Sequence, residues 1–270
     1  MDLWHAALLG IVQGLTEFVP VSSSGHLILA RYLLGLPGED QIGFVFDVLV
    51  QMGTWVAVIV YFRQELLAIA RDMLANIFQR KPATSEARIG WLVILATVPA
   101  VVVGWLLKDS MNGSLSSLTA TGIFLFGKTI LLAAAELIGR HNEGVEDMKA
   151  SDALWIGAAQ VLGLLPAISR SAATMFGGMT RDLRRRQAAR FAFLMAVPVM
   201  PAAALVALLQ LESLPSAADL VAPVIVGFVA AAIIGYITIR WLLHYLANRS
   251  LYPFAIYCAV LGALVLILAR

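Results

Sequence analysis

The N-terminal part of the sequence holds a first set of side chains that could act on a phosphate group. It combines an amide, a carboxylate, three hydroxyls, a glycine and an imidazole: Gln13, Glu17, Ser22, Ser23, Ser24, Gly25 and His26. The four-residue spacing of Gln13 and Glu17 places both on one face of a helix. Glu17 could hold a divalent cation that bridges phosphate oxygens, or act as a base. His26 could be an acid, a base or a nucleophile, and Ser22 or Ser23 is the other candidate nucleophile.

A second set of polar side chains lies in the C-terminal half of the chain: Ser169, Arg170, Ser171 and Thr174. A guanidinium is permanently charged, and its planar fork suits contact with two phosphate oxygens. Hydroxyls and backbone N–H groups at broken helix ends are further anion donors. The loops 22–25 and 169–172 therefore predict a cradle for one or two phosphates.

Each of these side chains also has a purely structural interpretation. A Glu–Arg pair can tie helices together, a histidine can be a satisfied buried residue, and Ser or Thr can cap a broken helix. Lys128 has no identifiable partner and is interpreted as structural or gating. Asp47 and Gln51 could line the mouth of a cavity, or Asp47 could mark the membrane interface. The occurrence of Glu, Ser, His and Arg together at two helix breaks favours a catalytic or binding role over a purely structural one.

The composition indicates that these residues sit inside a membrane protein. The chain has 270 residues, of which 60% are hydrophobic and 13% charged, and its mean hydropathy is +0.86. Soluble domains carry roughly 25% charged residues, so the surplus apolar surface must face lipid. The net charge of +2, without basic runs interleaved with aromatics, argues against nucleic-acid binding. The single cysteine, Cys258, excludes an internal disulfide.

The apolar residues fall into two kinds of segment. Six stretches are long enough, at ~20 residues, to cross a bilayer as helices: approximately 44–62, 88–107, 117–137, 187–210, 219–242 and 250–268. Two further regions, about 1–35 and 151–180, are broken near Pro20 and Pro166, and each half is too short to span. This pattern is typical of re-entrant helical hairpins, and the alternative is a pair of kinked spanning helices. The first region lacks the basic start of a cleavable signal peptide, so we expect it to stay in the chain.

The two broken regions resemble each other at a fixed offset of 147 residues. Matching pairs are Gly10 and Gly157, Gln13 and Gln160, Leu15 and Leu162, Ser22 and Ser169, Ser24 and Ser171, and further on Phe46 and Phe193, Val50 and Val197, Ala57 and Ala204. The sequence therefore predicts one membrane domain, 1–270, with repeats of approximately 1–137 and 151–270. Three spans per repeat is an odd number, so the second repeat enters from the opposite side. The predicted fold is an all-α integral membrane protein with six transmembrane helices and two re-entrant hairpins in an inverted-topology repeat.

The basic residues test this arrangement. Fourteen of the nineteen Lys and Arg residues fall on one side of the membrane if both hairpins return to their own side, and the other side keeps only Arg31, Lys108 and Arg270. By the positive-inside rule, both termini and the first hairpin are then extracytoplasmic. The basic cluster at 181–190 is explained by topology and lipid head groups rather than by catalysis.

At this point the sequence resembles the bacterial undecaprenyl-diphosphate phosphatases of the bacitracin-resistance type. The resemblance lies in the runs 13–26 and 166–174, with weaker likeness at 193–198 and 253–257, and so covers nearly the whole chain. It implies hydrolysis of undecaprenyl diphosphate to the monophosphate at the outer face of the cytoplasmic (inner) membrane. That reaction recycles the lipid carrier of peptidoglycan and cell-wall synthesis and supports bacitracin resistance. The resemblance also implies dependence on Mg²⁺ or Ca²⁺.

Carried over by position, the family pattern assigns roles to four residues of this chain. Glu17 is the essential carboxylate, Ser23 a proposed nucleophile, His26 a catalytic residue and Arg170 the phosphate-binding arginine. The sequence departs from the usual pattern at Gln13, where many members have Glu, and this leaves the number of metal ions open. Ala167 and Ala172 stand where the family typically has Gly. Because alanine disfavours positive φ, we expect the arginine loop to differ in shape.

Two other functions compete with the phosphatase hypothesis. Inverted repeats with broken helices also build secondary transporters, so a transporter or flippase of a polyprenyl phosphate lipid or anion is the main alternative. A non-catalytic membrane scaffold would explain the spans but not the buried Glu, His and Arg. The nucleophile stays open between Ser23, His26 and water. The lipid chain length, and whether the protein is a monomer or a homodimer, are also open.

Overall fold

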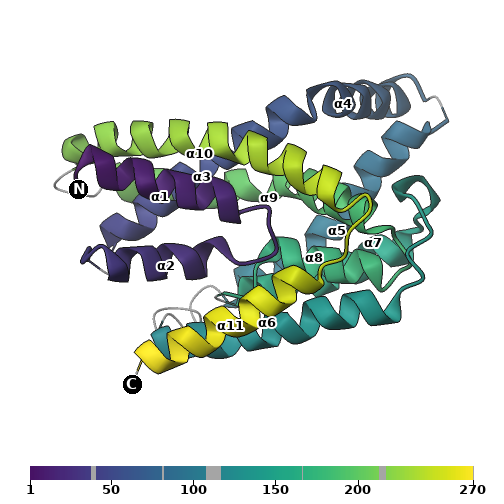
Figure 1. The fold of residues 1–270 in the computed structure, drawn as a ribbon. Helices are drawn as coiled ribbons and strands as arrows, with labels where there is room; N and C mark the ends of the chain where they lie inside the picture. The colour runs from purple at the N-terminus through teal and green to yellow at the C-terminus, as the bar shows by residue number, and fades with distance from the viewer. Residues whose placement is uncertain (38–40, 81, 108–116, 166, 213–216, 270) are drawn as a thin grey trace.

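The computed structural model shows an all-helical protein (Figure 1). It describes residues 1–37, 41–80, 82–107, 117–165, 167–212 and 217–269. Pro166 of the second break, and Lys81, Lys108 and Arg270 of the charge count, lie outside the described residues. Within the described ranges there is no β-strand, and a single isolated bridge joins Glu143 to Leu183. The prediction of an all-α fold is thus confirmed.

Eleven α-helices and two short 3-10 helices make up the described part of the chain. The α-helices are α1 (Leu3–Thr16), α2 (Ser23–Leu33), α3 (Gln41–Tyr61), α4 (Arg63–Phe78), α5 (Ser85–Leu107), α6 (Leu118–Ile138), α7 (Ala150–Val161), α8 (Arg170–Met179), α9 (Arg185–Glu212), α10 (Ala217–Tyr245) and α11 (Tyr252–Leu268), and the 3-10 helices are η1 (Val145–Asp147) and η2 (Leu162–Leu164).

Four of these helices are long and apolar enough to cross a membrane, judged by length and composition over the described residues. They are α3, α5, α6 and α10, and they contain or overlap the predicted spans 44–62, 88–107, 117–137 and 219–242. The predicted span 250–268 corresponds to α11, a shorter apolar helix of 17 residues. The span 187–210 lies within α9, which contains Pro198 and Pro201. Because several side chains of α9 are outside the described set, its crossing stays a prediction.

Two helical hairpins, α1–α2 and α7–α8, contain the breaks that the sequence predicted. Helix α1 has 14 residues and extends about 21 Å at 1.5 Å per residue, less than the ~30 Å hydrocarbon core. The other three arms are shorter still, with 11, 12 and 10 residues. In Figure 1 the turn between α1 and α2 lies near the middle of the molecule rather than at an end.

The hairpins pack across the two halves of the chain. Helix α1 packs on α10, while α7 packs on α5. The matched glycines make these contacts close: a Cβ on Gly10 would lie 2.3 Å from the carbonyl oxygen of Gly227, and one on Gly157 would lie 2.4 Å from that of Ala96. Both distances are far below van der Waals contact, so only glycine lets these helix backbones approach so closely.

Candidate active site

The turns of the two hairpins end in the same local structure. Ser22 and Ser169 both have positive φ, 77° and 75°, and each caps the helix that follows. The Oγ of Ser22 accepts a hydrogen bond from the N–H of Gly25 at 3.2 Å, and the Oγ of Ser169 accepts from the N–H of Ala172 at 3.4 Å. Strained backbone of this kind persists only where surrounding contacts hold it, and it is concentrated at functional sites.

The two alanines of the arginine loop behave differently from each other. Ala167 adopts positive φ, 59°, in spite of its Cβ. Ala172 lies in the first turn of α8 and does not have positive φ, so its Cβ is compatible with the backbone at this position. Its backbone N–H serves the Ser169 cap instead. At Ala167 the loop therefore adopts the conformation that glycine would favour. At Ala172 the backbone is helical, and any residue can adopt it.

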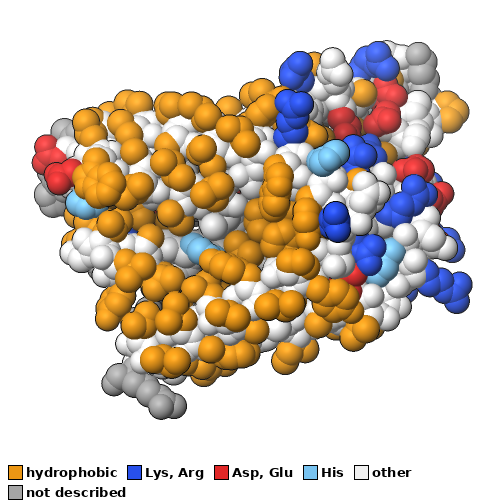
Figure 2. Space-filling view, viewed as in Figure 1, with side chains coloured by type: hydrophobic (Ala, Val, Ile, Leu, Met, Phe, Trp, Pro, Cys, Tyr) orange, Lys and Arg blue, Asp and Glu red, His pale blue; other side chains and the backbone are white. Residues whose placement is uncertain are grey.

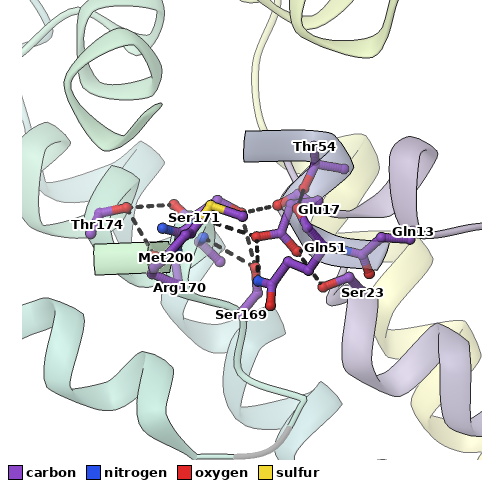
Figure 3. Close-up of polar contacts among 11 residues, drawn as sticks. Gln13, Glu17, Ser23, Gln51, Thr54, Ser169, Arg170, Ser171, Thr174 and Met200 are labelled. Carbon is purple, nitrogen blue, oxygen red and sulfur yellow. Dashed lines mark hydrogen bonds and ion pairs between the residues drawn. The ribbon is translucent and has the colours of Figure 1, made fainter. Parts of the chain in front are cut away.

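Glu17 is the centre of the polar network between the hairpins (Figure 3). The side chain is only 5% exposed. Its Oε2 accepts hydrogen bonds from Gln13 Nε2 at 2.9 Å and Ser23 Oγ at 2.8 Å. Its Oε1 accepts from Gln51 Nε2 at 3.1 Å and from Arg170 Nη2 at 3.0 Å. Four donors from α1, α2, α3 and α8 thus satisfy a carboxylate whose burial would otherwise be very unfavourable.

Arg170 is only partly satisfied by the protein. Its Nη2 contacts Glu17 and, at 3.7 Å, the sulfur of Met200. Its Nη1 is buried and has no hydrogen-bond partner among the described residues. An unpaired donor on a buried guanidinium costs free energy unless a ligand accepts from it. Arg170 therefore presents one free N–H edge for an anion.

A cavity of about 470 Å³ surrounds this network. Seven predicted site residues line it: Gln13, Glu17, Ser22, Ser23, Ser24, Ser169 and Arg170. Its walls also include Leu27 and Ile28 of α2 and Phe44 and Asp47 from the first half of α3. In Figure 1, α2 runs from the middle of the molecule toward the end that holds both termini, and α3 starts there. The cavity therefore extends from the hairpin turns toward that end.

The other predicted residues lie beside the cavity but do not line it. Ser171 donates to the backbone oxygen of Glu17 at 3.3 Å, which ties the second hairpin to the first. Thr174 donates to the backbone oxygen of Arg170 at 2.8 Å. Gly25 is buried in the first turn of α2. These three residues hold the shape of the turns.

His26 contacts its own turn and α11 rather than Glu17. One ring nitrogen, Nδ1, lies 2.6 Å from the backbone oxygen of Ser22, so it carries the proton of that bond. The other, Nε2, lies 2.8 Å from the hydroxyl of Tyr257, which then donates to it. The two rings are stacked with centroids 5.7 Å apart. Both nitrogens are therefore engaged, and His26 is not among the lining residues of the cavity.

Several contacts of the site are not apparent from the sequence. Gln51 appeared only as a candidate for the cavity mouth, yet it bonds directly to Glu17. Asp47 lines the cavity and pairs with the buried Arg31 at 2.6 Å. Tyr257 belongs to the run 253–257 that resembles the family, but its contact with His26 was not predicted. The contact of Met200 with Arg170 was not predicted either, because the partners are far apart in the chain. Lys128 is fully buried, and its Nζ has no hydrogen-bond partner among the described residues.

Two carboxylates line the cavity, Glu17 and Asp47, and Asp47 is paired with Arg31. Among the described residues, no group of three or more His, Cys, Asp or Glu side chains could hold one. Mg²⁺ commonly binds through one or two carboxylates together with substrate phosphates. The Glu17 carboxylate fits that mode if an ion takes the place of some of the hydrogen bonds that its oxygens accept, with substrate oxygens completing the coordination. The described residues do not fit a cage made by protein alone.

Comparison with known families decides what kind of protein carries this site. A family model described as "Bacitracin resistance protein BacA" matches residues 6–264. The chain belongs to this family. It is 40% identical to an undecaprenyl-diphosphatase of Rubrobacter xylanophilus, over 98% of this chain and 97% of the relative. It is 37% identical to one of Trichlorobacter lovleyi, over 97% and 95%, and 38% identical to one of Mycolicibacterium vanbaalenii, over 99% and 97%. The resemblance inferred from the runs 13–26 and 166–174 is thus confirmed for the BacA family, and four long apolar helices agree with an integral membrane protein.

Proposed function

We propose that this chain hydrolyses undecaprenyl diphosphate to undecaprenyl phosphate and inorganic phosphate. Its membership of the BacA family and its undecaprenyl-diphosphatase relatives support this activity. The observation that carries the proposal is the meeting of Ser23, Glu17 and Arg170 at one cavity wall. A hydroxyl, a base and a free guanidinium edge are the groups that phosphoryl transfer to a nucleophile requires.

In the proposed mechanism, the terminal phosphate accepts hydrogen bonds from Nη1 of Arg170 and from N–H groups at the starts of α2 and α8. Ser23 Oγ attacks phosphorus, and its proton passes to Oε2 of Glu17, 2.8 Å away. The bond from phosphorus to the bridging oxygen breaks, and undecaprenyl phosphate leaves. Water then attacks the phosphoserine while Glu17 returns the proton to Ser23 Oγ, releasing inorganic phosphate. Positioning and charge neutralisation contribute most of the rate.

We assign His26 a role at the first turn rather than as the attacking group. Its bond to the backbone oxygen of Ser22 supports the strained residue next to Ser23. Water activated directly by Glu17 is the other route that the same geometry serves.

We further propose that Mg²⁺ or Ca²⁺ binds at Glu17 together with phosphate oxygens of the substrate. Such an ion would neutralise negative charge on the transferring phosphoryl group. Gln13 stands where many family members have Glu, and its amide donates to Glu17 rather than adding a second negative charge. This supports a single metal ion.

For the membrane arrangement, we propose six spans, two re-entrant hairpins and an inverted repeat in the bacterial inner membrane. The short hairpin arms and the matching caps at Ser22 and Ser169 support it. Figure 2 shows Lys and Arg side chains gathered at the end of the molecule opposite the termini, which favours a cytoplasmic position for that end. The cavity then extends toward the extracytoplasmic side. A lipid diphosphate could reach it while its chain stays in the bilayer, which suits recycling of the cell-wall lipid carrier.

The transporter alternative is not favoured, because the curated relatives are named as diphosphatases. A scaffold without chemistry would not require a buried carboxylate with four donors.

The test is phosphate release from undecaprenyl diphosphate by the purified protein. Glu17→Gln removes the base and is expected to lower kcat at least ~100-fold, whereas the exposed Glu146→Gln is expected to stay within about two-fold. Chelation with EDTA should reduce the rate, and added Mg²⁺ or Ca²⁺ should restore it. No release by the wild type, with lipid movement across vesicles instead, would contradict the proposal.

The nucleophile is identified by trapping the phosphoenzyme and mapping the modified residue. We expect phosphate on Ser23 and its loss in Ser23→Ala. Label on His26 would refute attack by Ser23, and the absence of any phosphoenzyme in rapid-quench experiments would favour direct attack by water.

A further inference from the structure

A basic pocket lies at the end of the molecule opposite the termini, away from the cavity around Glu17. It has a volume of about 550 Å³ and is formed where α3 ends, α9 begins and α10 ends. Its lining residues are Tyr61, Arg186, Ile237, Arg240, Trp241, Leu243, His244 and Ala247. It shares no residue with the lining of the catalytic cavity.

The cations of this pocket are not used by the protein. Four of the five arginines in the cluster 181–190 have protein partners: Arg181 with Asp152, Arg184 with the backbone oxygen of Asn142, Arg185 with Glu136 and Arg190 with Glu65. Arg186 is the exception. Within the described part of the chain, the side chains of Arg186, Arg240 and His244 make no hydrogen bond or ion pair. No Asp or Glu is among the described residues that line the pocket. The positive-inside rule explains why basic residues lie at this end of the molecule. It does not explain why three unpaired basic side chains surround a single pocket.

An apolar groove continues from the basic pocket along the spanning helices. It has a volume of about 380 Å³ and runs between α3 and α10, lined by Val56, Ala57, Val60, Ala232, Ile233, Tyr236 and Ile237. Ile237 lines both the groove and the basic pocket. Trp241, which is 49% exposed, lines the basic pocket about one helical turn from Ile237 and stacks on Tyr245 with centroids 5.5 Å apart. Tryptophan and tyrosine are typical of the membrane–water interface.

We propose that this pocket and groove bind one anionic phospholipid. The phosphate of the head group lies between Arg186, Arg240 and His244, and an acyl chain lies in the groove beside Val60 and Ile233. Charge complementarity selects the anionic head group, and the continuity through Ile237 selects a ligand with a tail over a free phosphate. The bound lipid would be held against the ends of α3 and α10 and the start of α9. Helices α3 and α9 line the catalytic cavity, and α10 packs on α1 and α3.

The test is native mass spectrometry of the full-length, delipidated protein titrated with phosphatidylglycerol or phosphatidylcholine of identical chains. We expect the wild type to prefer phosphatidylglycerol by about ten-fold in Kd. Arg186→Gln combined with Arg240→Gln should abolish this preference. The matched control combines Arg140→Gln with Lys149→Gln, which removes the same charge from exposed residues outside the pocket and should keep it. Equal loss in both double variants, or no loss in the first, would overturn the proposal.

A second arm separates a lipid from a free anion. Val60→Trp fills the groove from its exposed side and should weaken phosphatidylglycerol binding several-fold while leaving the thermal midpoint unchanged. Inorganic phosphate at millimolar concentration should not displace the lipid. Displacement by phosphate, together with full affinity in the Val60→Trp variant, would identify a simple anion site and sink the lipid proposal.

Discussion

At the scale of single residues, the two hairpins have the same caps but different chemistry. The positions that correspond to Glu17 and His26 at the offset of 147 are Leu164 and Ala173, while Ser23 corresponds to Arg170. One hairpin therefore supplies the base and a hydroxyl, and the other supplies the cation. This division suits the transition state of phosphoryl transfer, which needs a nucleophile on one side and charge neutralisation on the other.

Gln13 and Gln160 allow a direct test of this difference. Both are buried, but Gln13 donates to Glu17, whereas the side-chain amide of Gln160 has no hydrogen-bond partner among the described residues. A hydrogen bond to a charged group contributes about 1.5–3 kcal/mol, so Gln13→Ala should lower kcat/KM by about ten-fold or more. Gln160→Ala should leave kcat within about two-fold, because no catalytic group depends on it. Steady-state phosphate release measures both, and equal losses would show that the Gln13 amide does not support Glu17.

At the scale of helices, two small-residue contacts set the distance between the halves of the chain. Gly10 on α1 lies against Gly227 of α10, and Gly157 on α7 lies against Ala96 of α5. Because Glu17 directly follows α1, and Arg170 belongs to the hairpin that α7 begins, the position of Glu17 relative to Arg170 depends on both contacts. A shift of either helix by one methyl group would widen the 3.0 Å contact between the two side chains.

Gly10→Ala and Gly157→Ala are therefore expected to destabilise the protein by about 1–3 kcal/mol each through overpacking, and to reduce activity. Gly104→Ala is the matched control. Its Cβ would lie 3.8 Å from Leu164, which is ordinary contact, and a helical Gly-to-Ala change gains about 0.5–1 kcal/mol. Thermal midpoints of the three purified variants provide the measurement. Unchanged midpoints for Gly10→Ala and Gly157→Ala would show that these helices can move apart without cost.

At the scale of the whole molecule, charge separates the two ends. Both termini lie at one end in Figure 1, while Figure 2 shows the Lys and Arg side chains gathered at the other. Several of the carboxylates at the basic end are paired with arginines, as in the pair of Glu136 and Arg185. The excess positive charge comes from side chains such as those of Arg140 and Arg186, which have no acidic partner in the described structure.

This separation predicts which loops a membrane-impermeant reagent can reach. In spheroplasts, a charged maleimide should label Asp2→Cys and should not label Lys149→Cys until the membrane is opened. The native Cys258 is buried, so the wild-type protein supplies the blank. Labelling of Lys149→Cys but not Asp2→Cys in intact spheroplasts would reverse the proposed orientation.

The sequence predicted those features that depend on neighbouring residues. The helix breaks, the shared face of Gln13 and Glu17 and the long apolar helices all follow from local spacing and composition, while capping by Ser was the structural alternative to a role in the phosphate cradle. The environment of His26 could not be predicted, because Tyr257 is 231 residues away. For the same reason, the contact between Gln51 and Glu17 could not be predicted. Nor could the sequence show that Arg186 is unpaired within a cluster of paired arginines. Such features depend on tertiary packing, which periodicity does not report.

The packing of α1 on α10 has a consequence for biosynthesis. Roughly 200 residues separate the end of α1 from the start of α10, so at about 5–20 residues per second the ribosome needs roughly 10–40 s to supply the partner. Glu17 thus enters the membrane well before Arg170 and α10 have been made. We therefore expect the nascent first hairpin to stay at the translocon or the lipid interface, where the Glu17 carboxylate is still hydrated. Its packing is completed only when the second half of the chain inserts and supplies Arg170 and α10.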